Sequence, residues 1–348
     1  MNKEHIGLLI DRKKEALPDR VIVFGPEDNL AAQVQADWLT TLLCQVYVQH
    51  GITKNREKLI ADIDAGICKL WFAAKDGKPI SSAAVIKQTD GSVEIGRAVS
   101  LVKGVGSFLR FLAIADHLAT SSGPVVSEVR IADQFAGIPS GEATQTVCFK
   151  HLGLIPQALV PAFCHGDPVR QEMFLFSSSE KIRAEEPIIL PNDRASLDLV
   201  VKTAMAVASE ALGNEQIIKT DGGSKQITKW SLVRSDPFCL MIPSDNGSQF
   251  ETVLGEAYKN APFTMIPLGT GPGHSSALIE CLNLGFIPCG FDRNLGGDGY
   301  PVLLLGKLRE GTLLAPIKLV SGLFGIRVVA GINNINRQFR SQLLSTIY

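Results

Sequence analysis

The residues best placed to do chemistry form a glycine loop, Val102-Lys103-Gly104-Val105-Gly106-Ser107. It lies between a β-branched run at 93–101, which predicts a strand, and an apolar run that predicts a helix over 107–119. Such a loop offers backbone N–H groups and the positive end of a helix dipole to a phosphate or pyrophosphate, and glycines allow close approach. By itself the pattern is equally typical of a plain helix-entry turn. The third glycine of a dinucleotide fingerprint is missing, because position 109 is Leu109.

The strand before this loop has one face that is small apart from a carboxylate. Strict alternation places Glu94, Gly96, Ala98 and Ser100 on that face, and Val93, Ile95, Val99 and Leu101 on the other. Glu94 is therefore a candidate proton acceptor, and Glu128 on the next predicted strand is a second candidate. The alternative for Glu94 is an exposed residue at the start of a strand.

Cys164, His165 and Asp167 invite a metal or triad interpretation. Neighbouring side chains in a short loop rarely converge on one ion, and catalytic partners usually come from distant segments. We interpret this segment as a polar loop, predict no metal, and keep His165 as a candidate substrate contact.

The periodicities along the chain predict how these groups are positioned. Between residues 20 and 178 the expected order is a strand, two helices, three strands, a helix, a strand, a helix and two strands. The turns Asp76-Gly77 and Asp90-Gly91 separate the three central strands and indicate hairpins. Hairpins give antiparallel neighbours and helical crossovers give parallel ones, so the sequence predicts an α/β fold with a mixed sheet.

The second half of the chain repeats part of this order after a polar linker at 177–187. The segments 151–156 and 283–288 share Leu, Gly, Ile and Pro at the same places. We therefore predict a duplication, with domains at 1–178 and 187–310. A helix that ends at Leu-Gly before a strand can also arise by chance.

The element order, the loop after the fourth strand and Phe149-Lys-His-Leu-Gly-Leu154 before the sixth resemble the GNAT superfamily of N-acetyltransferases. The resemblance covers residues 20–178 and, in degenerate form, 187–308. It implies two tandem GNAT-like domains, of which the first binds acyl-coenzyme A and passes the acyl group directly to an amine. The implied coenzyme-binding residues are Val99, Leu101, Val102, Lys103, Gly104, Val105, Gly106 and Ser107.

The resemblance also implies roles for single residues. A Glu on this strand commonly serves as the base, which favours Glu94 and then Glu128. The tyrosine that often protonates the leaving thiolate corresponds to Phe149, which has no proton to donate, so Cys148 beside it is an acid candidate, with a buried core thiol as the alternative. The family's usual Arg or Gln at the start of the loop is Leu101 here, so the backbone amides and Lys103 are expected to bind the pyrophosphate.

The loop at 243–248 in the second half corresponds to the glycine loop but keeps only Gly247. Asp245 would place a carboxylate beside the phosphates, which is repulsive. This half is expected to complete the acceptor pocket, to pack against the first half, or to form a homodimer contact.

Composition limits the class of protein. The chain has 348 residues and is 45% hydrophobic, and 34 Lys and Arg offset 35 Asp and Glu, so the net charge is −1. This balance excludes general disorder and a body that binds nucleic acid, and the length predicts two domains. The 7 cysteines include no C-x-x-C pair, which favours a reduced, cytoplasmic location. The sequence contains neither a signal-peptide pattern nor an apolar run long enough to cross a bilayer.

Residues 311–348 differ from the rest of the chain. They contain Lys318, Arg327, Arg337 and Arg340 and no acidic residue, so they carry +4 and the remainder −5. A basic apolar tail can contact an anionic membrane or a protein partner. The alternative, which we favour, is that it packs across the two domains.

We therefore expect an acyl-coenzyme A-dependent N-acyltransferase, most simply an acetyltransferase, that acts on an amine of a small molecule or peptide. One alternative is a noncatalytic coenzyme-binding or regulatory module, which Leu101 and Phe149 favour. The other is a structural protein that binds a partner through the tail.

Overall fold

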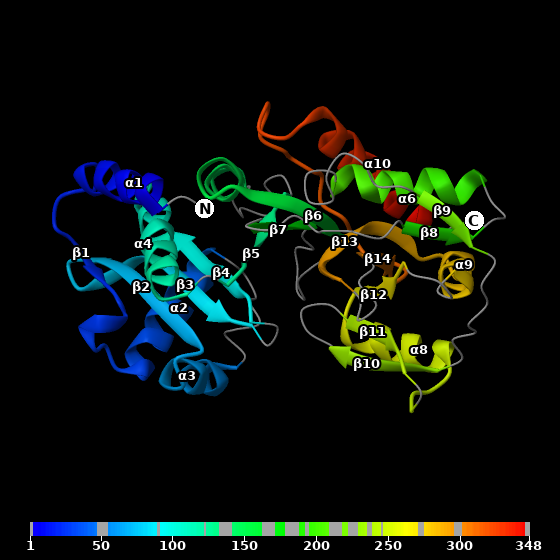
Figure 1. Ribbon diagram of the computed structural model, residues 1–348. Coiled ribbons are helices and arrows are strands. Elements are labelled where there is room, and N and C mark those ends of the chain that lie inside the picture. The colour runs from blue at the N-terminus through cyan, green and yellow to red at the C-terminus, as the bar shows by residue number, and fades with distance from the viewer. Residues whose placement is uncertain are drawn as a thin grey trace.

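The computed structural model describes residues 3–46, 55–88, 91–121, 123–131, 141–161, 171–177, 188–191, 195–208, 218–221, 229–234, 239–244, 246–270, 275–295 and 301–344. These form a sheet of 12 strands in the order β1-β2-β3-β4-β5-β7-β6-β13-β14-β12-β11-β10, and a separate pair, β8-β9 (Figure 1). The strands are β1 (Val21–Phe24), β2 (Cys68–Lys75), β3 (Lys78–Lys87), β4 (Val93–Ser100), β5 (Val125–Arg130), β6 (Leu154–Pro161), β7 (Gln171–Ser177), β8 (Ile188–Pro191), β9 (Ile218–Asp221), β10 (Trp230–Arg234), β11 (Cys239–Pro243), β12 (Phe263–Gly269), β13 (Ile287–Leu295) and β14 (Pro301–Leu308).

Helices cover the large sheet. They are α1 (Lys3–Glu15), η1 (Pro26–Asp28), α2 (Ala32–Val46), α3 (Arg56–Asp64), α4 (Val105–Thr120), α5 (Glu142–Gln145), the π-helical turn η3 (Thr146–His151), α6 (Ala195–Val207), α8 (Phe250–Asn260), α9 (Ser275–Asn283) and α10 (Ile326–Leu344).

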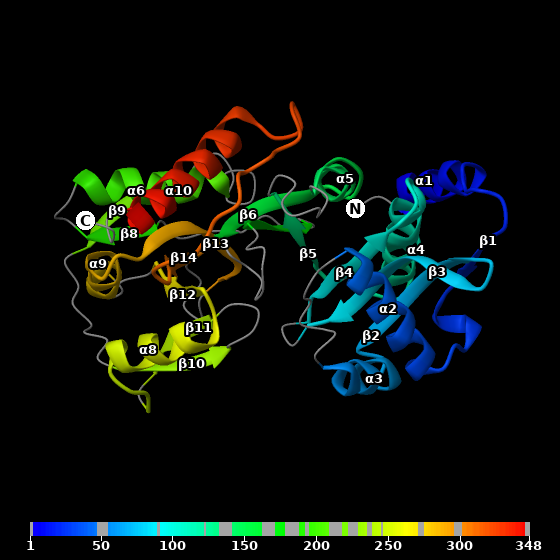
Figure 2. The same cartoon turned by 180° about the vertical axis from the view of Figure 1, so that it is seen from behind.

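The first half of the chain has the predicted mixed sheet. β4 and β5 are parallel, and the pairs β1-β2, β2-β3, β3-β4, β5-β7 and β6-β7 are antiparallel. α1 and α4 cover one face of this part of the sheet, and α2 and α3 cover the other (Figure 2). The α/β fold class and the element order are therefore confirmed. The sequence analysis missed α1, whose only apolar stripe is the short set Ile6, Leu9 and Ile10 that packs on the α4 side.

The second half repeats the strand relationships of the first. In the second half, β10-β11 is antiparallel, β11-β12 is parallel, and β12-β14 and β13-β14 are antiparallel. The first half shows the same series, in which β3-β4 is antiparallel, β4-β5 is parallel, and β5-β7 and β6-β7 are antiparallel. The predicted strand at the start of this half, β8, does not join the large sheet and pairs instead with β9. β9 and β10 were not predicted.

Within the sheet, the two halves are joined by antiparallel pairing of β6 with β13, where Ala158 pairs with Gly290. These two residues occupy the same place in the repeated segments, two positions after the shared Ile-Pro. A Cβ atom at position 290 would overlap the Gln157 carbonyl and Ala158, so the approach of the two strands requires glycine. The large sheet is therefore continuous from the first half into the second through β6 and β13.

The C-terminal segment packs onto the rest of the molecule, as we favoured. Val328, Ile332, Ile335 and Phe339 of α10 are buried in the same core as α1 and α4. Gly331 brings α10 against Val207 of α6, because a Cβ there would lie 2.9 Å from the Val207 nitrogen.

Two of the four tail cations serve this packing. Arg340 donates to the carbonyls of Leu314 and Ala315 at 3.3 and 3.1 Å, and Lys318 lies 3.6 Å from the Glu142 carboxylate. This internal use weakens the case for a lipid-binding tail. Among the described helices, none combines the length and apolarity needed to span a bilayer.

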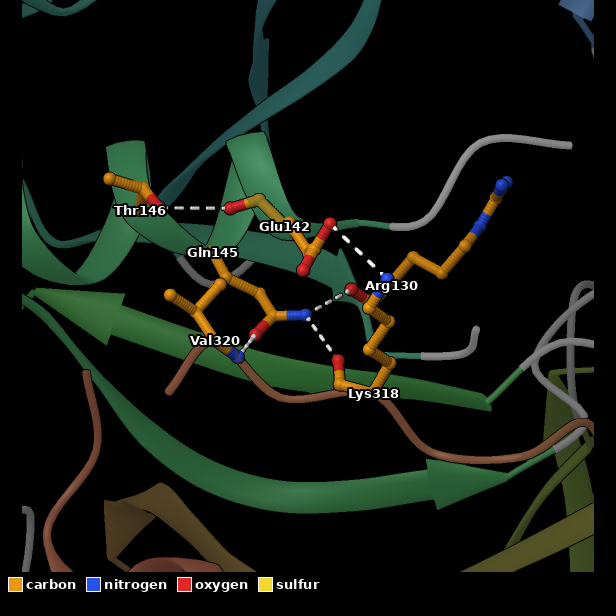
Figure 3. Close-up of polar contacts among 6 residues, drawn as sticks. All are labelled: Arg130, Glu142, Gln145, Thr146, Lys318 and Val320. Atoms are coloured by element: carbon orange, nitrogen blue, oxygen red, sulfur yellow. Dashed lines mark hydrogen bonds and ion pairs between the residues drawn. The ribbon is translucent and has the colours of Figure 1, made fainter. Parts of the chain in front are cut away.

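One buried amide, Gln145, ties the tail to the first half (Figure 3). Its Nε2 donates to the carbonyls of Arg130 and Lys318 at 3.2 and 3.0 Å, and its Oε1 accepts from the Val320 N–H at 3.0 Å. The amide therefore satisfies backbone groups from the end of β5 and from the tail together.

Replacing Gln145 tests this connection. We expect Gln145→Leu to lower the free energy of unfolding by about 3 kcal/mol, because buried backbone groups lose their partners. Limited proteolysis should then cut earliest near residues 315–325. Glu142→Gln is the control, since its ion pair with Lys318 is 45–46% exposed and is worth under about 1 kcal/mol. Equal stability loss in both variants, measured by urea unfolding, would contradict the assignment.

Candidate active site

The candidate site lies where β4 and β5 separate. The two parallel strands pair only at Val93 with Val125 and at Glu94 with Val126. Beyond this point the Ile95 carbonyl accepts a hydrogen bond from the Ser127 side chain at 2.9 Å. A buried hydroxyl thus replaces the next strand-to-strand bond, and the strands part.

A β-bulge follows in β4. Ser82 pairs with Val99 and Ala84 with Gly96, so Arg97 and Ala98 together face Ala83. Arg97 has a left-handed backbone, with φ 50°. Because a bulge inserts one residue, every later side chain changes face.

The strict alternation that we predicted for 93–101 is therefore wrong after Gly96. Val93 and Ile95 lie in the core under α1 and α4, as predicted, but Val99 lies in the core under α2 and α3. Leu101 is 44% exposed. The signal was Arg97 itself, since strict alternation would place a guanidinium among the apolar residues.

Two buried serines of β3 hold the bulge. The side chains of Ser82 and Ser81 donate to the carbonyls of Arg97 and Val99, each at 2.8 Å. Both serines are fully buried. With Ser127 they form a set that the sequence analysis missed, because small hydroxyl residues in a strand carry no periodic signal.

Glu94 sits at the point of separation and is half-buried. Its Oε2 accepts a hydrogen bond from Gln88 Nε2 at 3.1 Å. The carboxylate folds over Gly96, where a Cβ would overlap it. Glu94 pairs with Val126, and Glu128 lies two residues further along β5 on the same face. The two predicted carboxylates therefore lie on the two strands that border the gap between β4 and β5.

The glycine loop leads from β4 into α4. Gly104 has φ 88°, a conformation that favours glycine, and α4 begins at Val105, two residues earlier than predicted. The first turn holds no acidic residue and no side chain caps it. The N–H groups of Val105, Gly106 and Ser107 have no acceptor within the helix, so this end is electrostatically suited to an anion.

The remaining loop residues fix its shape. Leu101 donates its N–H to the Ile80 carbonyl at 2.9 Å, and the Ser100 side chain donates to the Val102 carbonyl at 2.7 Å. A Cβ at position 106 would lie 2.9 Å from Ser100 Cβ, so Gly106 allows the helix to start close to the sheet. Lys103 is exposed beside the helix start.

Cys148 is not placed to act as an acid. It is fully buried in η3, its thiol lies 3.6 Å from Ser127 Oγ as a donor, and burial raises the pKa of this thiol. A group without exposed surface cannot touch a substrate in this conformation, so the core interpretation replaces the catalytic one. Phe149 beside it packs on Phe324 of the tail, with ring centroids 4.8 Å apart.

The corresponding loop in the second half is closed by its own hydrogen bonds. Ser248 and Trp230 exchange two backbone bonds of 2.8 Å, and Gly247 donates to Ser244. The first turn of α8 also holds Glu251. Of the described amides in this loop, several are therefore already used, and a carboxylate adjoins the helix start. Asp245 lies outside the described residues.

The predicted substrate contact His165 also lies outside the described residues, with Cys164 and Asp167. Within the part that the structure covers, no group of three or more His, Cys, Asp or Glu side chains is arranged around a possible metal position.

No family model and no curated protein matches the chain. Solved structures similar to it include an N-acetyltransferase from Staphylococcus aureus at 12% identity, covering 45% of this chain and 96% of that one, with a TM-score of 0.34. An acyl-CoA N-acyltransferase from Pseudomonas aeruginosa has 16% identity, coverages of 45% and 98%, and a TM-score of 0.30. A GNAT-family acetyltransferase from Bacillus cereus has 17% identity, coverages of 45% and 96%, and a TM-score of 0.30. These three neighbours are acetyltransferases or acyltransferases that each cover 45% of this chain, and such a distant likeness assigns neither activity nor substrate.

A thiol substitution tests the placement of Cys148. We expect Cys148→Ala to retain whatever activity the wild type has and to lose about 1–2 kcal/mol of unfolding free energy through the lost core volume. Native protein should also protect this thiol from a maleimide reagent, while exposed Cys44 reacts. Loss of turnover in a folded Cys148→Ala variant would restore the acid assignment.

Proposed function

We propose that the protein is an acyl-coenzyme A-dependent N-acyltransferase, with an acetyl group as the expected cargo. The observation that carries this proposal is the continuity of three features along one segment. The half-buried carboxylate of Glu94 lies where β4 leaves β5, the bulge follows, and the uncapped start of α4 comes directly after it.

The start of α4 is suited to the coenzyme pyrophosphate. The N–H groups of Val105, Gly106 and Ser107 would donate to phosphate oxygens, and Lys103 would add charge from the rim. The pantetheine arm would extend along β4 past Val102 and Val99. Coenzyme binding then brings the thioester to the gap between the strands, where backbone N–H groups of the parted strands can stabilise the oxyanion.

Glu94 is the proposed base. The amine nitrogen attacks the thioester carbon, the C–S bond breaks, and the amine proton passes to the carboxylate directly or through water. Glu128 on the facing strand is the second candidate. No side-chain acid is assigned to the leaving thiolate, because Phe149 carries no proton to donate, and a thiol pKa of about 8.5 makes thiolate a competent leaving group.

The second half is proposed to be a degenerate copy, with domains at 1–178 and 187–310. Its β11 and β12 also pair at only two positions, Cys239 with Thr264 and Leu240 with Met265. Leu240 therefore stands where Glu94 stands in the first half. With no carboxylate there and with its loop amides already bonded, this half is proposed to support the first and to border the acceptor site.

A noncatalytic coenzyme-binding module is the second candidate, favoured by the packing of Phe149 on Phe324. Titration with acetyl-coenzyme A followed by thiol release on a panel of amines separates the two. Binding without release supports the module, and no binding removes both.

Glu94→Gln is the first test of the base. We expect kcat to fall by about 10²–10⁴-fold with little change in acetyl-coenzyme A affinity, because the amide keeps the shape but cannot take a proton. Glu128→Gln is the matched control on the facing strand. If only the Glu128 variant loses turnover, the assignment passes to that residue, and unchanged turnover in both removes them from the mechanism.

Ser107→Glu tests the pyrophosphate site by two readouts of opposite sign. A carboxylate in the first turn of α4 should stabilise the helix by about 0.3–1 kcal/mol. The same charge should repel the phosphates and weaken acetyl-coenzyme A binding at least about tenfold. Calorimetry and thermal unfolding measure the two effects. Unchanged affinity in Ser107→Glu, with Ser107→Gln as the neutral control, would place the coenzyme elsewhere.

A further inference from the structure

Arg97 is the most unusual residue of the candidate site. Among the described residues, those other than glycine with positive φ are Arg20, Asn29, Asp76 and Arg97, and of these only Arg97 lies inside a strand. Left-handed backbone is costly for a residue with a Cβ, and glycine would be the neutral choice. A strained residue at the gap between β4 and β5 indicates that its side chain has a use.

The Arg97 guanidinium is an unpaired charge within the part of the chain that the structure describes. The side chain is only partly exposed, and no hydrogen bond or ion pair joins it to a described residue. A guanidinium stays charged at every physiological pH and presents a planar fork of donors. A guanidinium without a protein partner is available to bind an anion through this fork.

Glu94 and Arg97 lie three residues apart on β4, on either side of the point where this strand leaves β5. Cys68, Ile86 and Glu94 lie side by side across β2, β3 and β4 on the face that α2 and α3 cover. Burial raises the pKa of the Cys68 thiol to about 12, the Arg97 charge acts to lower it, and Glu94 acts to raise it.

Two charged groups of α3 pair with each other. Asp62 and Lys58 also act on the Cys68 thiol, and they pair with each other at 3.1 Å. Glu94 holds Gln88. Of the charged groups around this thiol, Arg97 is thus the one left for an external anion.

We propose that the acceptor carries a carboxylate as well as the reacting amine, as an amino acid does, and that Arg97 binds this carboxylate while the amine meets Glu94. This inference rests on the proposed function, because it names the acceptor class of the same site. A guanidinium binds a carboxylate with two parallel hydrogen bonds and so also orients the molecule. Phosphate on the α4 start and carboxylate on Arg97 would occupy separate anion sites.

The test compares amino acids with their carboxamides, in which the amine is retained and the negative charge is removed. The variants are Arg97→Gly, which suits the left-handed backbone, and Arg97→Lys, which keeps the charge without the fork. Arg20→Gly is the matched control, since Arg20 has φ 62° and lies before β1. Thiol release from acetyl-coenzyme A gives kcat/KM, and calorimetry of the coenzyme A complex gives acceptor affinity.

We expect the wild type and Arg20→Gly to prefer amino acids over carboxamides by about 10–100-fold in kcat/KM. Arg97→Gly should lose this preference with unchanged acetyl-coenzyme A affinity, and Arg97→Lys should keep part of it. Equal use of acids and amides by the wild type, or a preference that survives in Arg97→Gly, would overturn the inference and leave the proposed function standing.

The calorimetric arm separates the two proposals. If no acceptor releases thiol, the acyltransferase proposal fails, and acceptor binding alone decides the role of Arg97. Amino acids that bind the wild type and not Arg97→Gly support that role, whereas absent or unselective binding removes it.

Discussion

The extra residue in β4 is the constraint on which the candidate site depends. Alternation fixes the face of every side chain in a strand, and one inserted residue reverses it from that point onward. In β4 this reversal occurs at Arg97 and Ala98, just after the last bond to β5. Val99 therefore leaves the α4 core for the α2 and α3 core. Three buried serines then satisfy carbonyls that a regular ladder would have paired, which allows the strands to part without orphaned polar groups.

The first half does not complete its core by itself. Phe324, Val328 and Phe339 of the tail belong to the same buried cluster as α1 and α4. Gln145 joins this tail to the end of β5, which is one of the two strands that border the gap. The tail therefore contributes to the rigidity of β5 and not only to the stability of the chain. Position 149 shows the consequence, because Phe149 serves this packing with Phe324 where a tyrosine could have served chemistry.

The sequence predicted the features that follow from local periodicity. The strands of the first half and its helices other than α1 follow alternating or helical patterns, and these patterns also locate the loop at Gly104 and the position of Glu94 on β4. The bulge was missed although Arg97 carried a local signal for it, because the hydroxyl that satisfies the Arg97 carbonyl, that of Ser82, belongs to another strand. The burial of Cys148 also depends on a distant partner, Ser127. The separate β8-β9 pair was missed for the same reason, since a short apolar run does not reveal which strand it will join.

The asymmetry between the halves has a physical basis in the two corresponding loops. In the second half, the Ser248 N–H donates to the Trp230 carbonyl of β10 and the Gly247 N–H donates to the Ser244 carbonyl, so these two loop donors are already used. Gly247 is required there because a Cβ would overlap the Trp230 backbone, so its glycine serves close packing. In the first half, Gly106 also allows close packing, against Ser100, but the N–H groups of its helix start remain unbonded within the helix. Glycine thus allows close packing in both loops, at Gly106 and at Gly247. The two helix starts differ in charge, because the first turn of α4 has no acidic residue and that of α8 contains Glu251.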